Sequence, residues 1–268
     1  MNGSSSPARV MVIGVAGRMG QEVLRAVHLA EGLEAVAGVD VHDDLSTVID
    51  AEAYPGLQLF EDTSQAIKAT DPDVAVDFTN AESCMQNVST LASAGIHIVI
   101  GTTGLSDSDV FAIRDLTRKN NIGAIIAPNF ALGAALLMHL SRISSPYFEY
   151  VDVHEMHHEN KIDSPSGTAM AIVRHIEEGG NGFKRPKSQK DLVPGSRGGD
   201  YKDITVFSSR MPGRVAHHEV TFGTLGQTLS IRHDSINRES FMPGVLLAIR
   251  HVLENNGLIV GLENLLEL

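Results

Sequence analysis

VMVIGVAGRMG at residues 10–20 combines a four-residue apolar run with three glycines, Gly14, Gly17 and Gly20. The apolar run predicts a strand, and the spacing of apolar residues after the glycines predicts a helix. Glycines let a backbone approach a phosphate closely, and the N–H groups at a helix N-terminus favour its negative charge. Strand, turn and helix together indicate a dinucleotide-binding α/β unit.

An acidic residue, Asp40, ends the second predicted strand at residues 33–39. A carboxylate there accepts hydrogen bonds from the adenosine ribose hydroxyls and repels a 2′-phosphate. Val41 supplies no compensating cation, so we expect NADH to be favoured, while Arg18 and His42 leave NADPH open. Because the spacing is GxxGxxG rather than GxGxxG, an ordinary glycine-rich turn is the alternative interpretation.

Three further apolar runs, at residues 74–78, 96–100 and 122–127, alternate with helical segments. Parallel strands need long crossovers, so this alternation predicts a doubly wound parallel sheet of the Rossmann type up to about residue 128. Ligands bind at the carboxyl ends of such strands. The turns GTTG at 101–104 and APNF at 127–130 are therefore candidate nicotinamide contacts, residues 77–79 are weaker candidates, and simple turn chemistry is the alternative.

The pattern of polar and apolar residues changes after Pro128. Residues 148–154, 204–207, 218–222 and 228–232 alternate in polarity, which predicts a second, sheet-rich domain. A helix is expected after Pro165, and a helical pattern from Pro243 to the end. Residues 184–199 contain prolines, glycines and basic side chains in loose spacing, and this composition predicts a mobile loop.

The overall composition is that of a globular protein. The 268 residues include 43% hydrophobic and 20% charged side chains, with a formal net charge of −12, which argues against a nucleic-acid partner. Neither a membrane-spanning apolar run nor a secretory signal is recognisable, so we expect a cytoplasmic protein without a membrane partner. The single cysteine, Cys84, excludes an intramolecular disulfide and a thiolate zinc site of the usual kind.

His154, Glu155 and His158 fit HExxH, a zinc-hydrolase signature. That signature requires a helix, whereas the preceding residues 147–153 alternate like a strand. On a strand the two histidines would lie about 13 Å apart, too far for one ion. We therefore expect no metal site, and a zinc hydrolase is the alternative.

The same segment can instead build an anion site. Pro165 suits the first turn of a helix and Ser164 its cap, which would leave N–H groups of residues 166–168 for a carboxylate. His157 and Lys161 beside such a site would supply a proton and hold negative charge, as the reduction of an anionic C=N or C=C compound requires. Surface histidines, a solvated lysine and a capped helix form the alternative interpretation.

Several motifs carry a family resemblance: HHENKIDSPSGTA at 157–169, GVAGRMG at 14–20, GTTG, APNFALG at 127–133, and the tail at 208–245. Together they resemble the 4-hydroxy-tetrahydrodipicolinate reductases, formerly called dihydrodipicolinate reductases, of bacterial lysine and diaminopimelate synthesis. The resemblance runs nearly end to end. It implies NADH- or NADPH-dependent reduction of 4-hydroxy-tetrahydrodipicolinate, an anionic cyclic dicarboxylate, to tetrahydrodipicolinate.

The resemblance also implies an organisation and a set of residue roles. It implies a Rossmann domain over residues 1–128 and 241–268, and an α+β substrate-binding domain over 129–240 whose open mixed sheet builds a homotetramer. His157 matches the proton donor and Lys161 the assisting lysine. The substrate's carboxylates match His158, Gly167 and Thr168, and the nucleotide contacts match Gly14, Val15, Ala16, Gly17, Arg18, Met19, Asp40, Gly101, Thr102, Thr103, Ala127, Pro128, Asn129 and Phe130. Four residues in matching segments receive no role: Arg210, Arg232, His233 and Arg238.

Two further classes remain as alternatives. A semialdehyde dehydrogenase would need a cysteine nucleophile, for which Cys84 is the candidate, but its place on a predicted helix favours a small core residue. A nucleotide-binding redox sensor would keep the glycine turn and would not need His157 or Lys161.

Overall fold

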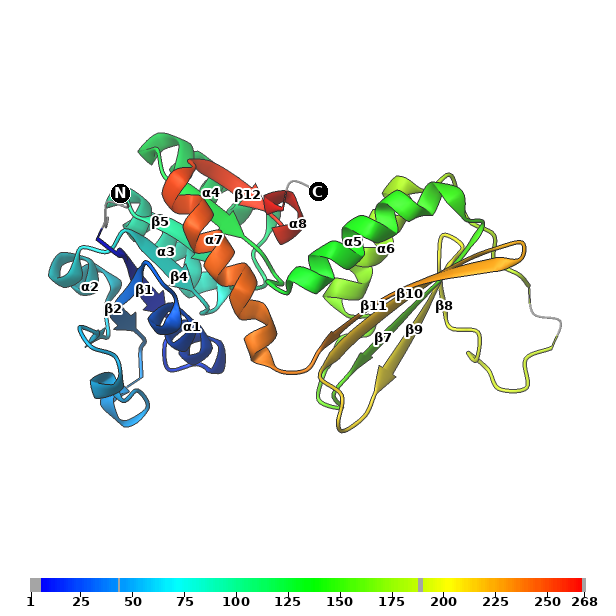
Figure 1. Ribbon diagram of the computed structural model, residues 1–268, viewed down its shortest axis with the longest axis horizontal. Coiled ribbons are helices and arrows are strands. Elements are labelled where there is room, and N and C mark those ends of the chain that lie inside the picture. The colour runs from blue at the N-terminus through cyan, green and yellow to red at the C-terminus, as the bar shows by residue number, and fades with distance from the viewer. Residues whose placement is uncertain (1–5, 43, 188–189, 267–268) are drawn as a thin grey trace. The chain divides into compact units, whose positions relative to one another are not determined.

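Figure 1 shows a computed structural model that describes residues 6–42, 44–187 and 190–266. These residues form two compact units. The first contains the described residues up to Phe130 and those from Phe241 onward, and the second is Ala131–Ser240. None of the helices in this part of the chain is long and apolar enough to cross a membrane.

The first unit is built on a seven-stranded sheet in which every described pairing is parallel. This confirms the predicted doubly wound fold. The strands, in their order across the sheet, are β12 (Gly257–Val260), β6 (Gly123–Ile126), β5 (His97–Ile100), β4 (Val74–Asp77), β1 (Ala8–Ile13), β2 (Leu33–Val39) and β3 (Gln58–Phe60). The chain runs outward from β1 in one direction through β2 and in the other from β4, so the topological switch point lies between β1 and β4.

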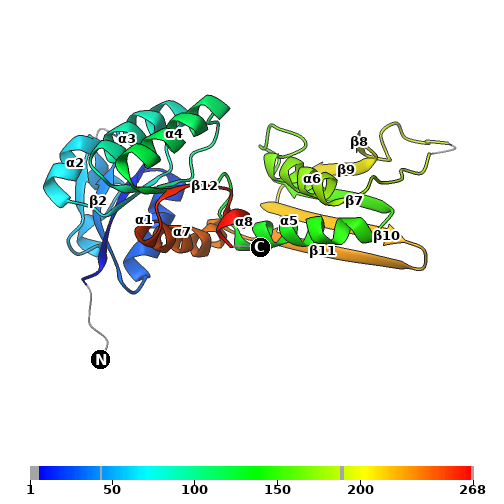
Figure 2. The same ribbon diagram turned by 90° about the horizontal axis from the view of Figure 1, so that it is seen from above.

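Helices cover both faces of this sheet (Figures 1 and 2). One face carries α2 (Thr63–Thr70), α3 (Ala81–Ser93) and α4 (Asp107–Asn120), and the other carries α1 (Arg18–Leu29) and α7 (Met242–Glu254). Short elements complete the unit: η1 (Leu45–Thr47), η2 (Ala51–Ala53) and α8 (Leu262–Leu265). Strand β12, which the sequence reasoning did not identify, pairs with β6 and brings the end of the chain into the sheet.

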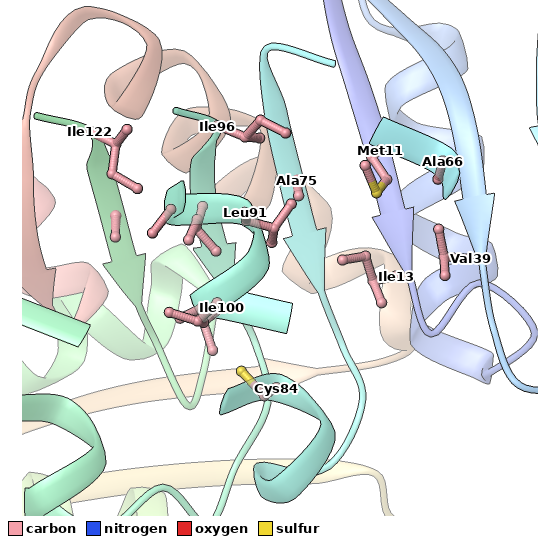
Figure 3. Close-up of a cluster of buried hydrophobic side chains, with 14 of the residues drawn as sticks. Met11, Ile13, Val39, Ala66, Ala75, Cys84, Leu91, Ile96, Ile100 and Ile122 are labelled. Carbon is pink, nitrogen blue, oxygen red and sulfur yellow. The ribbon is translucent and has the colours of Figure 1, made fainter. Parts of the chain in front are cut away.

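The core between the sheet and α2, α3 and α4 is apolar and close-packed (Figure 3). Cys84 lies in it beside Ile100 and is fully buried. Burial, with the nearby charge of Asp77, raises the pKa of the Cys84 thiol far above its ordinary value. Because a reactive cysteine needs an accessible thiolate, Cys84 is a core residue as predicted and does not supply the nucleophile of a semialdehyde dehydrogenase.

The second unit is a five-stranded mixed sheet with two helices, as the family resemblance implies. Its strand order is β11 (Gln227–Ser235), β10 (Ala216–Thr224), β7 (Tyr150–His157), β9 (Ile204–Arg210) and β8 (Gly199–Tyr201). Helices α5 (Leu132–Ser144) and α6 (Gly167–Gly179) pack side by side, and η3 (Ser145–Tyr147) and η4 (Arg238–Phe241) are short 3₁₀ turns. Residues 184–187 and 190–198 form no strand or helix, while 188–189 of the predicted loop lie outside the described residues.

The two faces of this sheet differ. Alternate residues of β7, β9 and β10 pack with α5 and α6 into an apolar core that includes Val153, Val206 and Val220. We call this side the helix-covered face. The other side, which holds Asp152, His154 and their cross-strand neighbours, is the open face, and no helix of the described residues lies on it.

Candidate functional site

The glycine turn of the first unit is built to hold an anion. Gly14 has φ +82° and its backbone N–H donates to Val39 O, while Gly17 N–H donates to Gly14 O at 3.0 Å. A Cβ on Gly20 would lie 2.1 Å from Gly14 O, so helix α1 can approach the turn only because residue 20 has no side chain. Among the described residues no side chain caps α1, whose first N–H groups therefore suit a phosphate.

A cavity of about 460 Å³ opens beside this turn, at the switch point of the sheet. Gly14, Gly17, Asp40 and Val41 line it. One carboxylate oxygen of Asp40 accepts the N–H of Ala16 at 2.9 Å, which ties the end of β2 to the glycine turn. The turn, the uncapped helix and the carboxylate fit the pyrophosphate and ribose of a dinucleotide.

A second cavity of about 320 Å³ continues along the same edge of the sheet. Gly101, Thr102 and Thr103 line it on one side, and Pro128, Asn129 and Phe130 on another, together with Met19 and Phe241. Phe78 and Thr79 line both cavities. The two predicted turns after β5 and β6 therefore come together beside the loop after β4.

The loops around the second cavity are held by the buried carboxylate of Asp77. Its Oδ1 accepts from the N–H and hydroxyl of Thr79, at 2.9 and 2.7 Å, and from the Thr102 hydroxyl at 2.8 Å. Its Oδ2 accepts from Asn87 Nδ2 at 2.9 Å. A single side chain thus joins the ends of β4 and β5 to helix α3. Sequence reasoning ranked residues 77–79 too low, although their place at a strand end was the signal.

Four of the predicted nucleotide residues do not line either cavity. Val15 and Ala127 are fully buried, and the Val15 side chain packs against Gly38. Arg18 is exposed at the start of α1, and Ala16 takes part through its N–H. The side chains of these four residues are therefore supports or neighbours of the cavities.

In the second unit, the polar residues gather at one end of the helix-covered face. Residues that pair across strands share a face of the sheet, and here Glu155 pairs with Ser208 and His218, and His157 with Arg210. These positions continue the rows that begin with the apolar Val153, Val206 and Val220. The row changes from apolar to ionisable just where β7 approaches its end.

The imidazole of His157 is held by a buried carboxylate. His157 Nδ1 lies 2.5 Å from Glu155 Oε2, and Glu155 is fully buried while His157 is 6% exposed. Arg210 donates two hydrogen bonds to Glu155, Nη1 to Oε2 at 2.9 Å and Nη2 to Oε1 at 2.7 Å. Burial raises the pKa of Glu155, but hydrogen bonds from His157, Arg210 and Ser208 outweigh burial and lower this pKa to about 2. Glu155 is therefore an anion.

A second buried histidine, His218, packs edge-on against His157 with ring centroids 5.3 Å apart. Its Nε2 lies 3.3 Å from the hydroxyl of Ser166, and its buried Nδ1 has no partner among the described residues. Burial, with the charge of His157, lowers the pKa of His218 to about 3. It is therefore neutral near pH 7.

Helix α6 begins beside this cluster, and its cap differs from the expected one. Ser166, not Ser164, is the N-cap, because its hydroxyl accepts the Ala169 N–H at 3.1 Å. Pro165 therefore precedes the helix instead of forming its first turn. The prediction of Ser164 as the cap was wrong because both serines fit the pattern, and the local backbone decides between them.

Lys161 and the start of α6 hold a carboxylate of the protein itself. Lys161 Nζ lies 2.8 Å from Asp163 Oδ1. The hydrogen bond from Lys161 lowers the pKa of Asp163, burial opposes this, and the backbone N–H groups of Asp163 and Gly167 lower it further. His158 is exposed next to this loop, and Gly167 and Thr168 form the first two helical residues. Of the predicted substrate residues, Gly167 and Thr168 thus lie at the N-terminus of α6, and His158 lies directly after β7.

The structure also places the four residues to which sequence reasoning gave no role. Arg210 binds Glu155, whereas Arg232 lies on the open face and pairs with Glu219 and Asp234. His233 is half-buried on the helix-covered face, where a Cβ on Gly133 would lie 2.3 Å from its ring. Arg238 begins the short turn η4.

The HExxH segment is not helical. Its first four residues lie in β7 and His158 follows the strand, so the strand prediction is confirmed and the zinc-hydrolase helix is not formed. His154 stacks on Phe207 with ring centroids 4.5 Å apart, on the face opposite to Glu155 and His157. Hence the two histidines of the signature do not converge on one ion.

The low pKa of His218 leads to a prediction about stability. As the pH falls below 6.5 the unfolded chain binds a proton that the folded protein refuses until about pH 3, so stability decreases with decreasing pH in that window. We expect a loss on the order of 2 kcal/mol between pH 6.5 and 5, at about 1.4 kcal/mol per pH unit and proton. His218→Gln should flatten this dependence in urea unfolding curves, and the control His42→Gln, at an exposed position, should not. An unchanged slope in His218→Gln would contradict the assignment.

Two family models match the chain almost completely. The model described as "Dihydrodipicolinate reductase, N-terminus" matches residues 8–130, and "Dihydrodipicolinate reductase, C-terminus" matches residues 133–266. A 4-hydroxy-tetrahydrodipicolinate reductase of Dehalococcoides mccartyi is 41% identical over 264 residues, covering 98% of this chain and 100% of that protein. One of Mycolicibacterium gilvum is 43% identical over 262 residues, covering 97% and 99%.

A solved structure shows the same architecture. The dipicolinate-bound dihydrodipicolinate reductase of Paenisporosarcina sp. TG-14 matches with a TM-score of 0.87 at 36% identity, covering 96% of this chain and 99% of that one. The likeness therefore extends through both units.

Proposed function

Since the chain belongs to the dihydrodipicolinate reductase family, we propose that His157 is the proton donor of its reaction and Lys161 the cation that assists it. The enzyme is an oxidoreductase that reduces 4-hydroxy-tetrahydrodipicolinate in lysine and diaminopimelate biosynthesis with a nicotinamide dinucleotide. The assignment of its residues rests on the arrangement at the ends of β7 and α6.

The buried imidazole of His157 is the observation that carries the proposal. Its Nδ1 is engaged by Glu155, so Nε2 is the nitrogen available to a substrate. The reaction removes the 4-hydroxyl group of the substrate as water and adds a hydride and a proton to the ring. A bound reduced nicotinamide would supply the hydride, and the N–H bond at Nε2 of His157 would break to supply the proton. Water then restores the proton to His157. An imidazole that carries hydrogen on both nitrogens can give one proton as a general acid and regain it from solvent.

The substrate's carboxylates are proposed to bind at the N-terminus of α6. The support is that Lys161 and the Gly167 N–H already hold the carboxylate of Asp163 there. Gly167 and Thr168 begin this helix, His158 follows β7, and together they would complete the contacts. Each of the two carboxylates of the substrate would then meet positive charge or N–H groups, as anion binding requires.

For the cofactor, we propose binding by the glycine turn, Asp40 and the loops after β5 and β6, with NADH preferred. The cavity beside the turn is lined by three carboxylates, Asp40, Glu61 and Asp62, and by neither lysine nor arginine among its described residues. This lining repels the 2′-phosphate that distinguishes NADPH.

The proposal is tested by initial rates of NADH and NADPH oxidation, with substrate generated freshly from pyruvate and aspartate semialdehyde by the preceding synthase. We expect the larger kcat/KM with NADH. Val41→Arg adds a cation to the cavity at an 88% exposed position. The ratio of kcat/KM with NADPH to kcat/KM with NADH should rise about tenfold, equivalent to about 1.4 kcal/mol. Leu29→Arg, at an exposed position outside both cavities, is the charge-matched control. A wild-type preference for NADPH would contradict the NADH assignment.

Assembly as a homotetramer in the cytoplasm completes the proposal. The open face of the second unit's sheet supports it, because that face presents side chains of β7, β10 and β11 that no helix of the described residues covers. Light scattering of the purified enzyme measures the mass of the assembly directly.

A further inference from the structure

We propose that Glu155 and Arg210 are positioning residues that set the ring orientation and tautomer of His157, and that Arg210 links this histidine to the loop that carries Lys161. The inference rests on the proposed role of His157. It assigns a function to the ion pair that Arg210 forms with the fully buried Glu155 in the polar cluster of the second unit.

The geometry fixes the hydrogen-bonding role of one ring nitrogen of His157. Glu155 and His157 are two residues apart on β7, so both point to the helix-covered face, and the ring nitrogen Nδ1 meets the carboxylate at 2.5 Å. A carboxylate held by two N–H donors of Arg210 can only accept a hydrogen bond from that nitrogen. Nδ1 therefore carries a hydrogen, and after proton transfer the neutral ring keeps it there. Nε2 is left as the atom that gives and regains the catalytic proton.

Arg210 keeps Glu155 from taking that proton. Buried carboxylates otherwise become protonated, and burial does raise the pKa of Glu155, but the hydrogen bonds from His157, Arg210 and Ser208 lower it to about 2. Glu155 thus stabilises the imidazolium without acting as a base. The ring of His218 on β10 packs against His157 and is neutral near pH 7. Lys161 and Asp163 pair with each other in the loop before α6, which Arg210 contacts through the Asp163 carbonyl.

The same guanidinium reaches the lysine arm of the site. Arg210 Nη2 also donates to the backbone carbonyl of Asp163 at 2.7 Å, and Asp163 pairs through its side chain with Lys161. Arg210 therefore fixes the separation between the end of β7 and the loop before α6. Its planar fork makes both contacts at once, which a lysine could not do.

Glu155→Gln is the first test. We expect kcat to fall on the order of 100-fold, as for other residues that orient a catalytic histidine, while the KM for substrate changes less than about threefold. Because a neutral amide stabilises the imidazolium less than a carboxylate does, the alkaline limb of the pH profile of kcat should move about one to two units lower. Glu149→Gln removes an exposed carboxylate paired with Lys184 in the same unit and should change neither quantity.

A second measurement separates positioning from folding. Glu155→Gln leaves the Arg210 charge without its carboxylate partner, and the loss of this partner alone destabilises the fold. The double variant Glu155→Gln with Arg210→Gln removes both charges, and we expect it to recover thermal stability without recovering kcat. Recovery of both stability and kcat would show a purely structural pair and overturn the proposal.

The tautomer is observed directly in the wild-type enzyme labelled with ¹⁵N-histidine. We expect the long-range ¹⁵N–¹H spectrum of the neutral His157 ring to show Nδ1 as the protonated nitrogen, with the signals assigned by their loss in His157→Gln. A protonated Nε2 would overturn the proposal. If Glu155→Gln retains kcat and its pH profile while His157→Gln is inactive, positioning fails and the proposed function stands. An active His157→Gln would instead remove the proposed function.

Discussion

Replacing His157 with glutamine should lower kcat by roughly 10²–10⁴-fold, the usual contribution of a positioned general acid. The glutamine side chain can occupy the space of the imidazole beside Glu155, but it has no proton to give near neutral pH. The loss should appear in kcat, because His157 is not among the residues proposed to hold the substrate's carboxylates. Steady-state rates with freshly generated substrate measure it.

The binding of NADH provides the control for this variant. Both cavities assigned to the cofactor are built entirely from the first unit, so the Kd for NADH should be unchanged in His157→Gln. A His157→Gln enzyme within fivefold of the wild-type kcat would refute the proton-donor assignment.

Lys161→Gln, by contrast, should raise the KM for substrate as well as lower kcat, since Lys161 is the cation proposed to bind the substrate's carboxylate.

Gly20→Ala should raise the KM for NADH on the order of 100-fold, because displacements of about 1 Å at a binding site can have effects of that size. The added methyl group would lie 2.1 Å from Gly14 O and 2.8 Å from Val15 Cα, both backbone atoms that cannot rotate away. Helix α1 must therefore move from the glycine turn. We also expect the free energy of unfolding to fall by about 1–3 kcal/mol, as in other overpacked sites.

Helix propensity makes this a stringent prediction. Alanine is favoured over glycine within a helix by about 1 kcal/mol, so propensity alone predicts a more stable variant. Gly223→Ala in strand β10 is the control for an added methyl group without a clash, because its nearest neighbour would be Tyr150 Cβ at 3.8 Å, an ordinary contact. Urea unfolding and NADH titration of both variants decide the matter. A stabilised Gly20→Ala enzyme with normal KM would show that the close approach is not required.

The sequence predicts the first unit well because its signals are local. An apolar run, a glycine turn and the acid at Asp40 occur within one strand–helix–strand segment, and the predicted strands agree with β1, β2, β4, β5 and β6 to within a few residues. The three-residue strand β3 was not predicted. Strand β12 escaped because GLIV at 257–260 is too short to distinguish from helix by its pattern. Only its pairing with β6 identifies it.

The second site shows the limit of reasoning from local pattern. His157 and Lys161 share one segment and are found together, but the partners of His157 come from distant strands. Arg210 reaches it through the register of β9, and His218 lies on β10, 61 residues beyond His157. Registers between distant strands are set by the whole fold, so no local signal reveals these contacts. Glu155 could have been found, because it lies two residues before His157 on a predicted strand.

The two-faced strand β7 has a consequence for how such an enzyme can change. Odd-numbered residues from Val151 to His157 face the core and the chemistry, whereas the even-numbered ones, such as His154, face the open side. The pairing register of β7 cannot shift by one residue, because such a shift would move the odd-numbered side chains to the open face and the even-numbered ones to the core. Substitutions at the even-numbered positions of β7 can therefore change the open face while the odd-numbered positions, which face the core and His157's partners, stay the same.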